Sequence, residues 1–267
     1  MNHVFKKFPI IISMLFIVSL INSCCPRNIS NDYMLSAIAW KQTSAEARAL
    51  SYQAFGIARY RFDEIKSEYN GSKPLAVIVD IDETVLDNTP FEAALILGDR
   101  SHPANLRQWT DKADAPAIPG ALDFLNYVNS QGAEIFYLTN RSEKDKTATM
   151  KNLTIQNFPN VSETSVVMKT DQPDKTGRIQ TIAEKCSIAL IIGDSLGDFG
   201  GFYSRNLTIE QRAELVESKK DAFGAEYILL PNPMYGDWEK TIYRYQRNLQ
   251  NSEKRKLLKS VLNAFSR

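Results

Sequence analysis

Short apolar runs alternate with longer amphipathic segments along most of the chain. The five apolar runs are residues 75–79, 134–138, 165–168, 188–192 and 226–230. Runs of this length, bounded by turn residues, predict strands that are buried on both faces of a parallel sheet. The amphipathic segments between them predict covering helices at residues 121–131, 175–185 and 208–220. The pattern therefore predicts an α/β protein with a doubly wound parallel sheet.

Two further regions flank this alternating pattern. Residues 32–69 contain no proline and a single glycine, and their apolar positions have helical spacing, which predicts one or two amphipathic helices. Residues 87–119, between the first two strands, read as a loop with short helices. We expect a small helical cap over the site to come from residues 32–70 and 87–119. A final helix is predicted over residues 237–265.

The first residues have the pattern of a secretory signal. Residues 1–23 begin with a basic stretch and continue with an apolar run over residues 10–21, which is short for a membrane-spanning helix. The residues before Cys24 resemble a bacterial lipobox, which implies lipidation at Cys24; the cysteine that follows it is the alternative. Residues 24–31 would then be a lipidated tether, and residues 32–267 the folded domain.

Composition narrows the classes of function. The chain has 267 residues, 43% hydrophobic content and a net charge of +1, so it lacks the basic excess expected of a protein that binds a nucleic-acid polymer. Its two histidines, His3 and His102, form no cluster. This argues against a histidine-rich zinc site and a serine-histidine-aspartate triad, and it leaves metals with oxygen ligands open.

Acidic residues follow two of the predicted strands directly. Asp80 and Asp82 come after the strand at 75–79, and Asp194 and Asp198 come after the strand at 188–192. Carboxyl ends of parallel strands form the ligand edge of such sheets, and carboxylates crowded there repel each other unless a cation or a proton relieves them. An all-oxygen cluster of this kind suits Mg²⁺.

A polar turn also follows the second strand. Thr139, Asn140 and Arg141 stand where the chain passes from a strand into a helix. A threonine hydroxyl together with the next backbone N–H groups at such a turn can hold a phosphate. An N-cap threonine without any ligand is the alternative.

The longer motifs resemble one family throughout. Asp80-x-Asp82-x-Thr84 is similar to the nucleophile motif of the haloacid dehalogenase superfamily. More specific stretches resemble the class C acid phosphatases, the lipoprotein e(P4) family, within that superfamily. These stretches are residues 39–46, 52–55, 78–88, 193–199 and 231–239. The resemblance implies a haloacid-dehalogenase-type fold with a small helical cap.

The resemblance also implies catalytic roles. Asp80 would attack phosphorus and form an aspartyl phosphate, and Asp82 would protonate the leaving alcohol. Thr139 and one lysine would hold the transferring phosphoryl group. Lys175 fits the family pattern of a lysine at the start of a helix better than Lys169, which is the alternative.

The implied cofactor is Mg²⁺. Its ligands would be Asp80, the backbone carbonyl of Asp82 and Asp194, with Asp198 behind them. Crowding by these acids should raise the pKa of Asp82 while the metal opposes that shift, so we expect an acidic optimum.

Substrate preference depends on two aromatic residues. The resemblance places Tyr235 where a nucleoside base would stack, with an aromatic residue of the cap on the opposite face. Trp109 is the candidate for that partner, although this chain has Leu106 where relatives have a second tryptophan. The alternative is that Tyr235 and Trp109 are ordinary, partly buried aromatic residues.

The sequence therefore predicts a Mg²⁺-dependent acid phosphomonoesterase with 5′-nucleotidase-like activity, anchored by lipid in a bacterial envelope, at the outer membrane or facing the periplasm. The expected partners are a small phosphomonoester, a nucleoside monophosphate above all, and the membrane. Asn140 and Arg141 would contact the substrate with Trp109 and Tyr235. A heme- or nutrient-binding lipoprotein and a phosphotransferase are the alternatives. Whether the protein forms a homodimer is left open.

Overall fold

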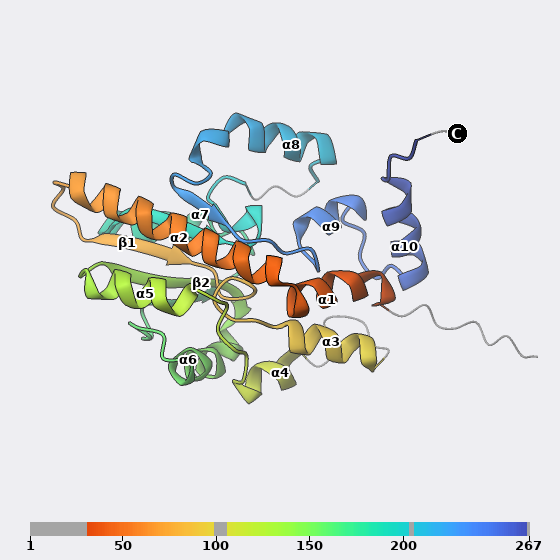
Figure 1. Ribbon diagram of the computed structural model, residues 1–267, viewed down its shortest axis with the longest axis horizontal. Coiled ribbons are helices and arrows are strands. Elements are labelled where there is room, and N and C mark those ends of the chain that lie inside the picture. Colours follow the sequence, from red (N-terminus) through yellow and green to blue (C-terminus); the bar gives the residue numbers. More distant parts are fainter. Residues whose placement is uncertain (1–30, 99–105, 203–205, 266–267) are drawn as a thin grey trace, which may run out of the picture.

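The computed structural model describes residues 31–98, 106–202 and 206–265, and it has a five-stranded sheet at its centre (Figure 1). All strand pairings are parallel, and the strand order is β3-β2-β1-β4-β5. The strands are β1 (Leu75–Val79), β2 (Glu134–Ser142), β3 (Val166–Lys169), β4 (Ser187–Gly193) and β5 (Tyr227–Leu229). The predicted α/β fold is confirmed, and every strand overlaps a predicted apolar run.

Helices cover both faces of the sheet. On one face, Val77 and Val79 pack in a core with Phe62, and on the other face Ala76 and Ile78 pack in a second core. The first face is covered by α2 (Ala45–Glu68), α5 (Ala121–Ser130) and α6 (Lys146–Ile155). The second face is covered by α7 (Thr176–Lys185) and α8 (Ile209–Ser218). Each large apolar side chain buried here contributes about 1.5–3 kcal/mol of transfer free energy.

The strand order determines where on the sheet a ligand would bind. The chain crosses from β1 to β2 and β3 on one side, and later to β4 and β5 on the other side of β1. The switch point therefore lies between the carboxyl ends of β1 and β4, where parallel α/β sheets bind ligands. Asp80 follows β1 at this point, and Asp194 follows β4.

The cap is made of short helices. The insertion between β1 and β2 contains α3 (Thr89–Leu97) and α4 (Leu106–Lys112). The helix α1 (Leu35–Thr43) and the turn η1 (Asn31–Met34) pack against α3. The long helix α2 belongs to the core, because Phe55 and Phe62 lie in the apolar layer on the sheet. The cap contribution expected from residues 32–70 is therefore limited to η1 and α1.

The predicted final helix is wrong in its length. The structure has two separate helices, α9 (Asp237–Ile242) and α10 (Asn251–Ser260). Arg244, Tyr245 and Asn248 between them have positive φ angles, which a helix does not contain. A capping box that begins at Gln250 starts α10. The remaining short elements are the 3₁₀ turns η2 (Glu143–Asp145), η3 (Leu196–Asp198) and η4 (Lys220–Ala222).

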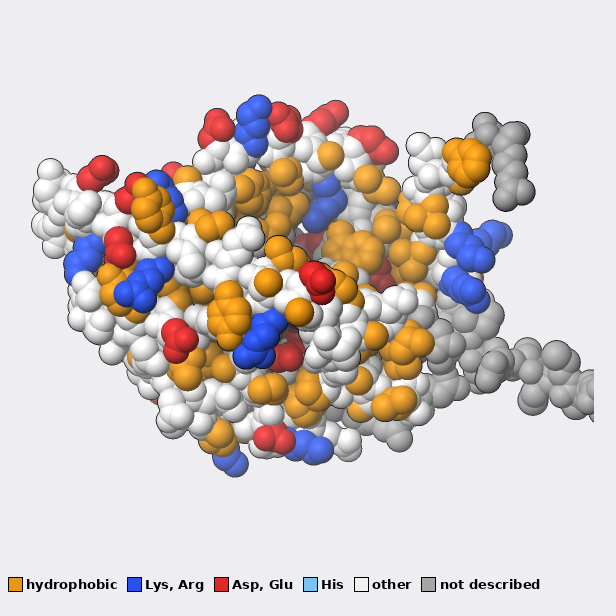
Figure 2. Space-filling model, in the orientation of Figure 1, with side chains coloured by type: hydrophobic (Ala, Val, Ile, Leu, Met, Phe, Trp, Pro, Cys, Tyr) orange, Lys and Arg blue, Asp and Glu red, His pale blue; other side chains and the backbone are white. Residues whose placement is uncertain are grey.

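An apolar groove lies beside the edge strand β5. Leu50 and Ile57 of α2, Val216 of α8 and Leu229 of β5 are among the residues that line it. Figure 2 shows apolar side chains gathered in the hollow between α2 and α8. Leu196, at one end of the groove, begins the η3 turn that carries Asp198. The groove is thus adjacent to the loop after β4.

The predicted signal peptide, the tether and lipidation at Cys24 fall outside the described residues, and they stay predictions. Residues 99–105 of the insertion are outside them as well. Among the described helices, none combines the length and the apolar character needed to cross a bilayer.

A buried acid in the cap provides a pH-dependent prediction. Glu92 of α3 is buried, and burial together with the nearby carboxylate of Glu239 in α9 raises its pKa to about 7. A folded-state pKa above the ordinary value means that folding favours the protonated acid. The contribution of Glu92 to stability should therefore be fully present below about pH 4.5, the ordinary value for glutamate, and be lost as pH rises through about 7.

Glu92→Gln should remove this dependence, because the amide does not ionise. The change between pH 5 and pH 8 should be smaller than in the wild type by up to about 3 kcal/mol, from 1.36 kcal/mol per unit of pKa. Urea unfolding at both pH values measures it. Glu214→Gln, on the exposed face of α8, is the control. An unchanged pH dependence in Glu92→Gln would show that Glu92 is not the responsible group.

Candidate active site

Asp80 is the first residue after β1 and is fixed by the backbone. Its N–H donates to the carbonyl oxygen of Ile192 in β4 at 2.9 Å. Its side chain is buried and forms an ion pair with the ammonium of Lys175. Burial raises the pKa of Asp80 well above its ordinary value, Lys175 opposes this shift, and the charge of Asp198 adds to it. Positive charge in the site would relieve the repulsion between the Asp80 and Asp198 carboxylates.

Lys175 supplies part of that charge. It precedes α7 and is only 1% exposed. Its Nζ donates to the carbonyl oxygen of Leu138 at 2.6 Å and lies 2.8 Å from Asp198 Oδ1. Burial lowers the pKa of Lys175, but the charges of Asp198 and Asp80 outweigh burial and raise it overall. The ammonium therefore stays protonated between two carboxylates, whereas Lys169, the alternative, lies at the end of β3.

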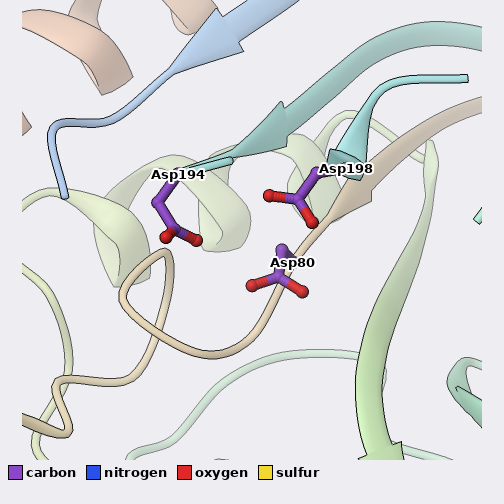
Figure 3. A group of neighbouring side chains, drawn as sticks. All are labelled: Asp80, Asp194 and Asp198. Carbon is purple, nitrogen blue, oxygen red and sulfur yellow. The ribbon is translucent and has the colours of Figure 1, made fainter. Parts of the chain in front are cut away.

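Three carboxylates meet at the switch point. Asp80, Asp194 and Asp198 each offer an oxygen within 4.8 Å of the others, and Figure 3 shows them converging from the ends of β1 and β4. Thr84 Oγ1 donates to Asp194 Oδ1 at 3.1 Å, and Asn232 Nδ2 donates to its Oδ2 at 2.8 Å. Burial and the charge of Asp198 raise the pKa of Asp194 to about 7.

The side chain of Asp198 packs closely against the backbone at the end of β4. Its Oδ2 accepts the backbone N–H of Ser195 at 2.9 Å in a capping box. A Cβ at Gly193 would lie 2.5 Å from the Cβ of Asp198, so only glycine fits at the end of β4. The loop thus holds Asp198 against both β4 and Lys175.

This donor set fits a hard divalent cation. The carboxylates of Asp80, Asp194 and Asp198 carry three negative charges when ionised, and the ammonium of Lys175 supplies one positive charge. Two negative charges then remain, which a divalent ion would neutralise. Oxygen ligands alone favour Mg²⁺ or a similar hard ion over zinc.

Asp82 lies outside the three-carboxylate cluster and forms an ion pair with Arg141. Arg141 Nη2 lies 2.8 Å from Asp82 Oδ1, and Asn88 Nδ2 donates to the same oxygen at 2.7 Å. Burial acts to raise the pKa of Asp82, but the Arg141 guanidinium, the hydrogen bond from Asn88 and the charge of Lys175 together lower it overall. The prediction of a raised Asp82 pKa is wrong, because Arg141 lies against this carboxylate and favours its charged form.

The turn after the second strand carries the expected polar groups. Thr139 is fully buried, and its Oγ1 accepts the backbone N–H of Arg141 at 3.0 Å and lies 3.4 Å from Asp82 Oδ2. Arg178 of α7 donates to the carbonyl oxygen of Thr139 and to Asn140 Oδ1, both at 2.7 Å. The turn at residues 139–141 is therefore held between the loop that carries Asp82 and α7.

The two predicted stacking residues lie in different apolar clusters. Trp109 of α4 packs on the core of the first sheet face, and its Nε1 donates to Asn88 Oδ1 at 2.7 Å. Tyr235 packs beside Met34, Ile38 and Met234, where η1 and α1 meet the loop after β5. Their roles as base-stacking residues stay predictions.

Several site residues were not assigned from the sequence. Asn88, Thr84 and Asn232 bind the catalytic aspartates, and Arg178 holds the turn at Thr139. All four lie in or beside the motif segments, on strand-end loops or at the first turn of α7. Polar residues that follow buried strands were therefore the available signal, but their partners are distant in sequence.

Fold and site together are those of a protein of the haloacid dehalogenase type. The family described as HAD superfamily, subfamily IIIB (Acid phosphatase), matches residues 15–238. The chain belongs to this family. The predicted haloacid dehalogenase superfamily is thereby confirmed.

Known relatives agree with this assignment. The chain is 30% identical to the class B acid phosphatase of Salmonella arizonae over 146 residues, which are 51% of this chain and 61% of that protein. It is 30% identical over 93 residues to the class B acid phosphatase of Aggregatibacter actinomycetemcomitans, covering 32% of this chain and 40% of the relative. The chain thus matches less than two thirds of the length of these curated relatives.

A solved structure covers more of the molecule. The class C acid phosphatase from Bacillus anthracis superimposes with a TM-score of 0.85 at 34% sequence identity. The match covers 88% of this chain and 99% of that one. One structure of that protein has tungstate bound.

Proposed function

We propose that this protein is a Mg²⁺-dependent acid phosphomonoesterase that works through an aspartyl-phosphate intermediate. The observation that carries the proposal is the buried contact of Lys175 with Asp80 and Asp198 beside Asp194. Such a site places a carboxylate nucleophile beside an ammonium group that can also hold a phosphate. Tungstate in the related class C enzyme supports an oxyanion site in this fold.

The residues divide the chemistry between two aspartates. An Asp80 carboxylate oxygen attacks phosphorus as the bond to the leaving oxygen breaks, and the protonated form of Asp82 delivers a proton to that oxygen. Because the pKa of Asp82 is lowered in the free site, this form is more abundant at acidic pH. Water then attacks the aspartyl phosphate while Asp82 takes its proton, which releases phosphate and restores Asp80. Thr139 and Lys175 hold the phosphoryl oxygens during both steps.

The metal would be held by Asp80, the backbone carbonyl of Asp82 and Asp194. When bound, it would supply positive charge that offsets the charge of the phosphate. Asp198 fixes the position of Lys175, and its place near the cluster leaves a ligand role open.

Phosphate release from p-nitrophenyl phosphate, with and without EDTA, tests this proposal. We expect turnover by the purified protein, loss of at least about 100-fold with EDTA, as for loss of a main electrostatic stabiliser, and recovery with added Mg²⁺. An absence of turnover under all conditions would favour a binding lipoprotein. Phosphorylated glycerol among the products, with glycerol added, would favour a phosphotransferase.

We also propose a preference for nucleoside monophosphates, with Tyr235 stacking on the base. Stacking on an aromatic residue is worth about 1–3 kcal/mol per base. Tyr235→Ala should therefore lower kcat/KM for AMP by about 5- to 150-fold, and for p-nitrophenyl phosphate much less. Tyr235→Phe, which keeps the ring, should keep the preference. Equal losses on both substrates in Tyr235→Ala would contradict a stacking role.

Attachment to the bacterial envelope through a lipid on Cys24 is proposed from the sequence alone, with the enzyme at the outer membrane or facing the periplasm. Lipid labelling that is present in the wild type and lost in Cys24→Ser would support it. Persistent labelling of that variant would move the site to the next cysteine or refute the anchor.

A further inference from the structure

We infer that Asn88 and Trp109 are positioning residues that orient the Asp82 carboxylate, so that its Oδ2 atom is the one that exchanges the proton with the leaving group. The inference rests on the proposed phosphatase function and assigns residues that this function alone does not require. Asn88 is buried and comes from the loop before α3, and Trp109 comes from α4 of the cap.

The two oxygens of Asp82 have different surroundings. Oδ1 accepts hydrogen bonds from Asn88 Nδ2 at 2.7 Å and from Arg141 Nη2 at 2.8 Å and Nε at 3.0 Å. From the described part of the chain, Oδ2 has two longer contacts, at 3.2 Å from Arg141 Nε and at 3.4 Å from Thr139 Oγ1. The hydrogen bonds from Asn88 Nδ2 and Arg141 Nη2 occupy the two lone pairs of Oδ1, and the Nε–H of Arg141 is shared between the two oxygens. Oδ2 is therefore the oxygen left for proton transfer.

Trp109 fixes the orientation of the Asn88 amide. An indole N–H is only a donor, so the atom of Asn88 that lies 2.7 Å from Trp109 Nε1 must be the carbonyl oxygen. The amide nitrogen of Asn88 must then face Asp82, as the contact at 2.7 Å requires. Without the indole N–H, Asn88 Oδ1 keeps one longer contact, from Arg141 Nη2 at 3.5 Å. The amide then loses its shortest restraint and holds Asp82 Oδ1 less firmly.

The remaining contacts hold this arrangement from both sides. The backbone N–H of Asn88 donates to Glu83 Oε1 at 2.9 Å, which fixes the loop that carries the amide. Arg141 Nη1 donates to Thr149 Oγ1 at 3.1 Å, which fixes the guanidinium on the other side of Asp82. The indole of Trp109 is anchored because its ring packs on the core of the first sheet face. Helix α4 is thus connected through one amide to the proton donor.

The consequence for catalysis depends on the leaving group. When the bond from Asp80 to phosphorus forms, the phosphorus–oxygen bond breaks and its electron pair goes to the leaving oxygen, which takes the proton from Asp82 Oδ2. An alkoxide needs that proton, because alcohols are very weak acids. A dinitrophenolate is a stable anion and leaves without it. A misplaced Asp82 should therefore impair only the first kind of substrate.

The test compares glycerol 2-phosphate with 2,4-dinitrophenyl phosphate in Trp109→Phe and Asn88→Leu. Trp109→Phe removes the N–H and keeps an aromatic ring, and Asn88→Leu removes the amide at similar size. The parameter is kcat/KM, which covers the steps up to departure of the leaving group. We expect at least a tenfold loss for glycerol 2-phosphate and less than a twofold change for 2,4-dinitrophenyl phosphate. Asn129→Leu, on the exposed side of α5, is the matched control and should change neither.

Circular dichroism and thermal melting show whether each variant is folded, and Trp109→Phe decides alone if Asn88→Leu does not fold. Equal losses on both substrates would mean a general structural role and would overturn the inference. Unchanged kcat/KM for glycerol 2-phosphate in Trp109→Phe would overturn it as well. A wild-type protein inactive on both phosphates would instead refute the proposed function, and the inference with it.

Discussion

Asp80→Asn should abolish turnover while leaving the fold intact. The amide is not a nucleophile. The other described carboxylates near Asp80 are engaged elsewhere, because Asp82 is paired with Arg141, Asp194 accepts from Thr84 and Asn232, and Asp198 is fixed in the η3 turn. We expect kcat for p-nitrophenyl phosphate to fall by at least about 10⁴-fold, as for removal of a covalent nucleophile.

A trapping experiment separates loss of the nucleophile from loss of structure. Acid quenching during turnover of a labelled phosphomonoester should yield an acyl phosphate on the wild type and none on Asp80→Asn. Asp123→Asn, on the exposed face of α5, is the matched control and should retain both activity and labelling. Thermal melting should show a folded variant, because the substitution removes one of three crowded carboxylates. Retention of a tenth of the wild-type activity would refute the covalent mechanism.

The sheet was predictable from the sequence for a physical reason. A parallel strand buried on both faces needs a continuous apolar run, and Val77 and Ile78 illustrate this because they face opposite cores. The C-terminal helix was mispredicted because helical spacing continues across residues 243–250, where positive φ angles at Arg244 and Tyr245 break it. Backbone strain of that kind leaves no periodic signal.

The site was predictable only in part. The carboxyl ends of parallel strands meet at one edge of the sheet. The proximity of acids that follow β1 and β4, such as Asp80 and Asp194, can therefore be predicted from the sequence. The orientation of the side chains could not be predicted in this way. Arg141 was expected to contact substrate, which stays a prediction. The fold also places it on Asp82, 59 residues away in sequence. Together with Asn88 and Lys175, that contact also lowers the pKa of Asp82 against the effect of burial.

The same limit applies to the cap. The pattern of residues 87–119 indicates short helices, but no spacing rule joins Trp109 to an amide 21 residues earlier. Such hydrogen bonds depend on how α4 packs, which is decided by tertiary contacts. Polar networks inside a site are therefore the part of a fold that sequence patterns describe least.

Lys175→Met should remove most of the activity and also destabilise the protein at neutral pH. The ammonium of Lys175 is the cation that contacts both Asp80 and Asp198 among the described residues, so methionine leaves two buried carboxylates facing each other. Loss of one electrostatic stabiliser of the transferring group should lower kcat by about 10²–10³-fold. Removal of one partner of a buried ion pair should lower the free energy of unfolding by about 3–5 kcal/mol.

The destabilisation caused by Lys175→Met should become smaller as pH falls. Without the ammonium, the pKa values of the facing carboxylates rise further in the folded state than in the wild type, so folding favours their protonated forms. The free energy of unfolding of Lys175→Met should therefore approach that of the wild type as pH falls from 8 to 5. Urea unfolding at the two pH values, with kcat on p-nitrophenyl phosphate, measures both effects.

Lys169→Met is the matched comparison, because Lys169 is the other lysine that the sequence allows in this role. It lies at the end of β3 and is only half-buried, so its replacement should leave kcat and stability close to those of the wild type. A loss of activity in Lys169→Met with retention in Lys175→Met would reverse the assignment. Equal stability of Lys175→Met and the wild type at pH 8 would show that Asp80 and Asp198 do not depend on the ammonium for their charge balance.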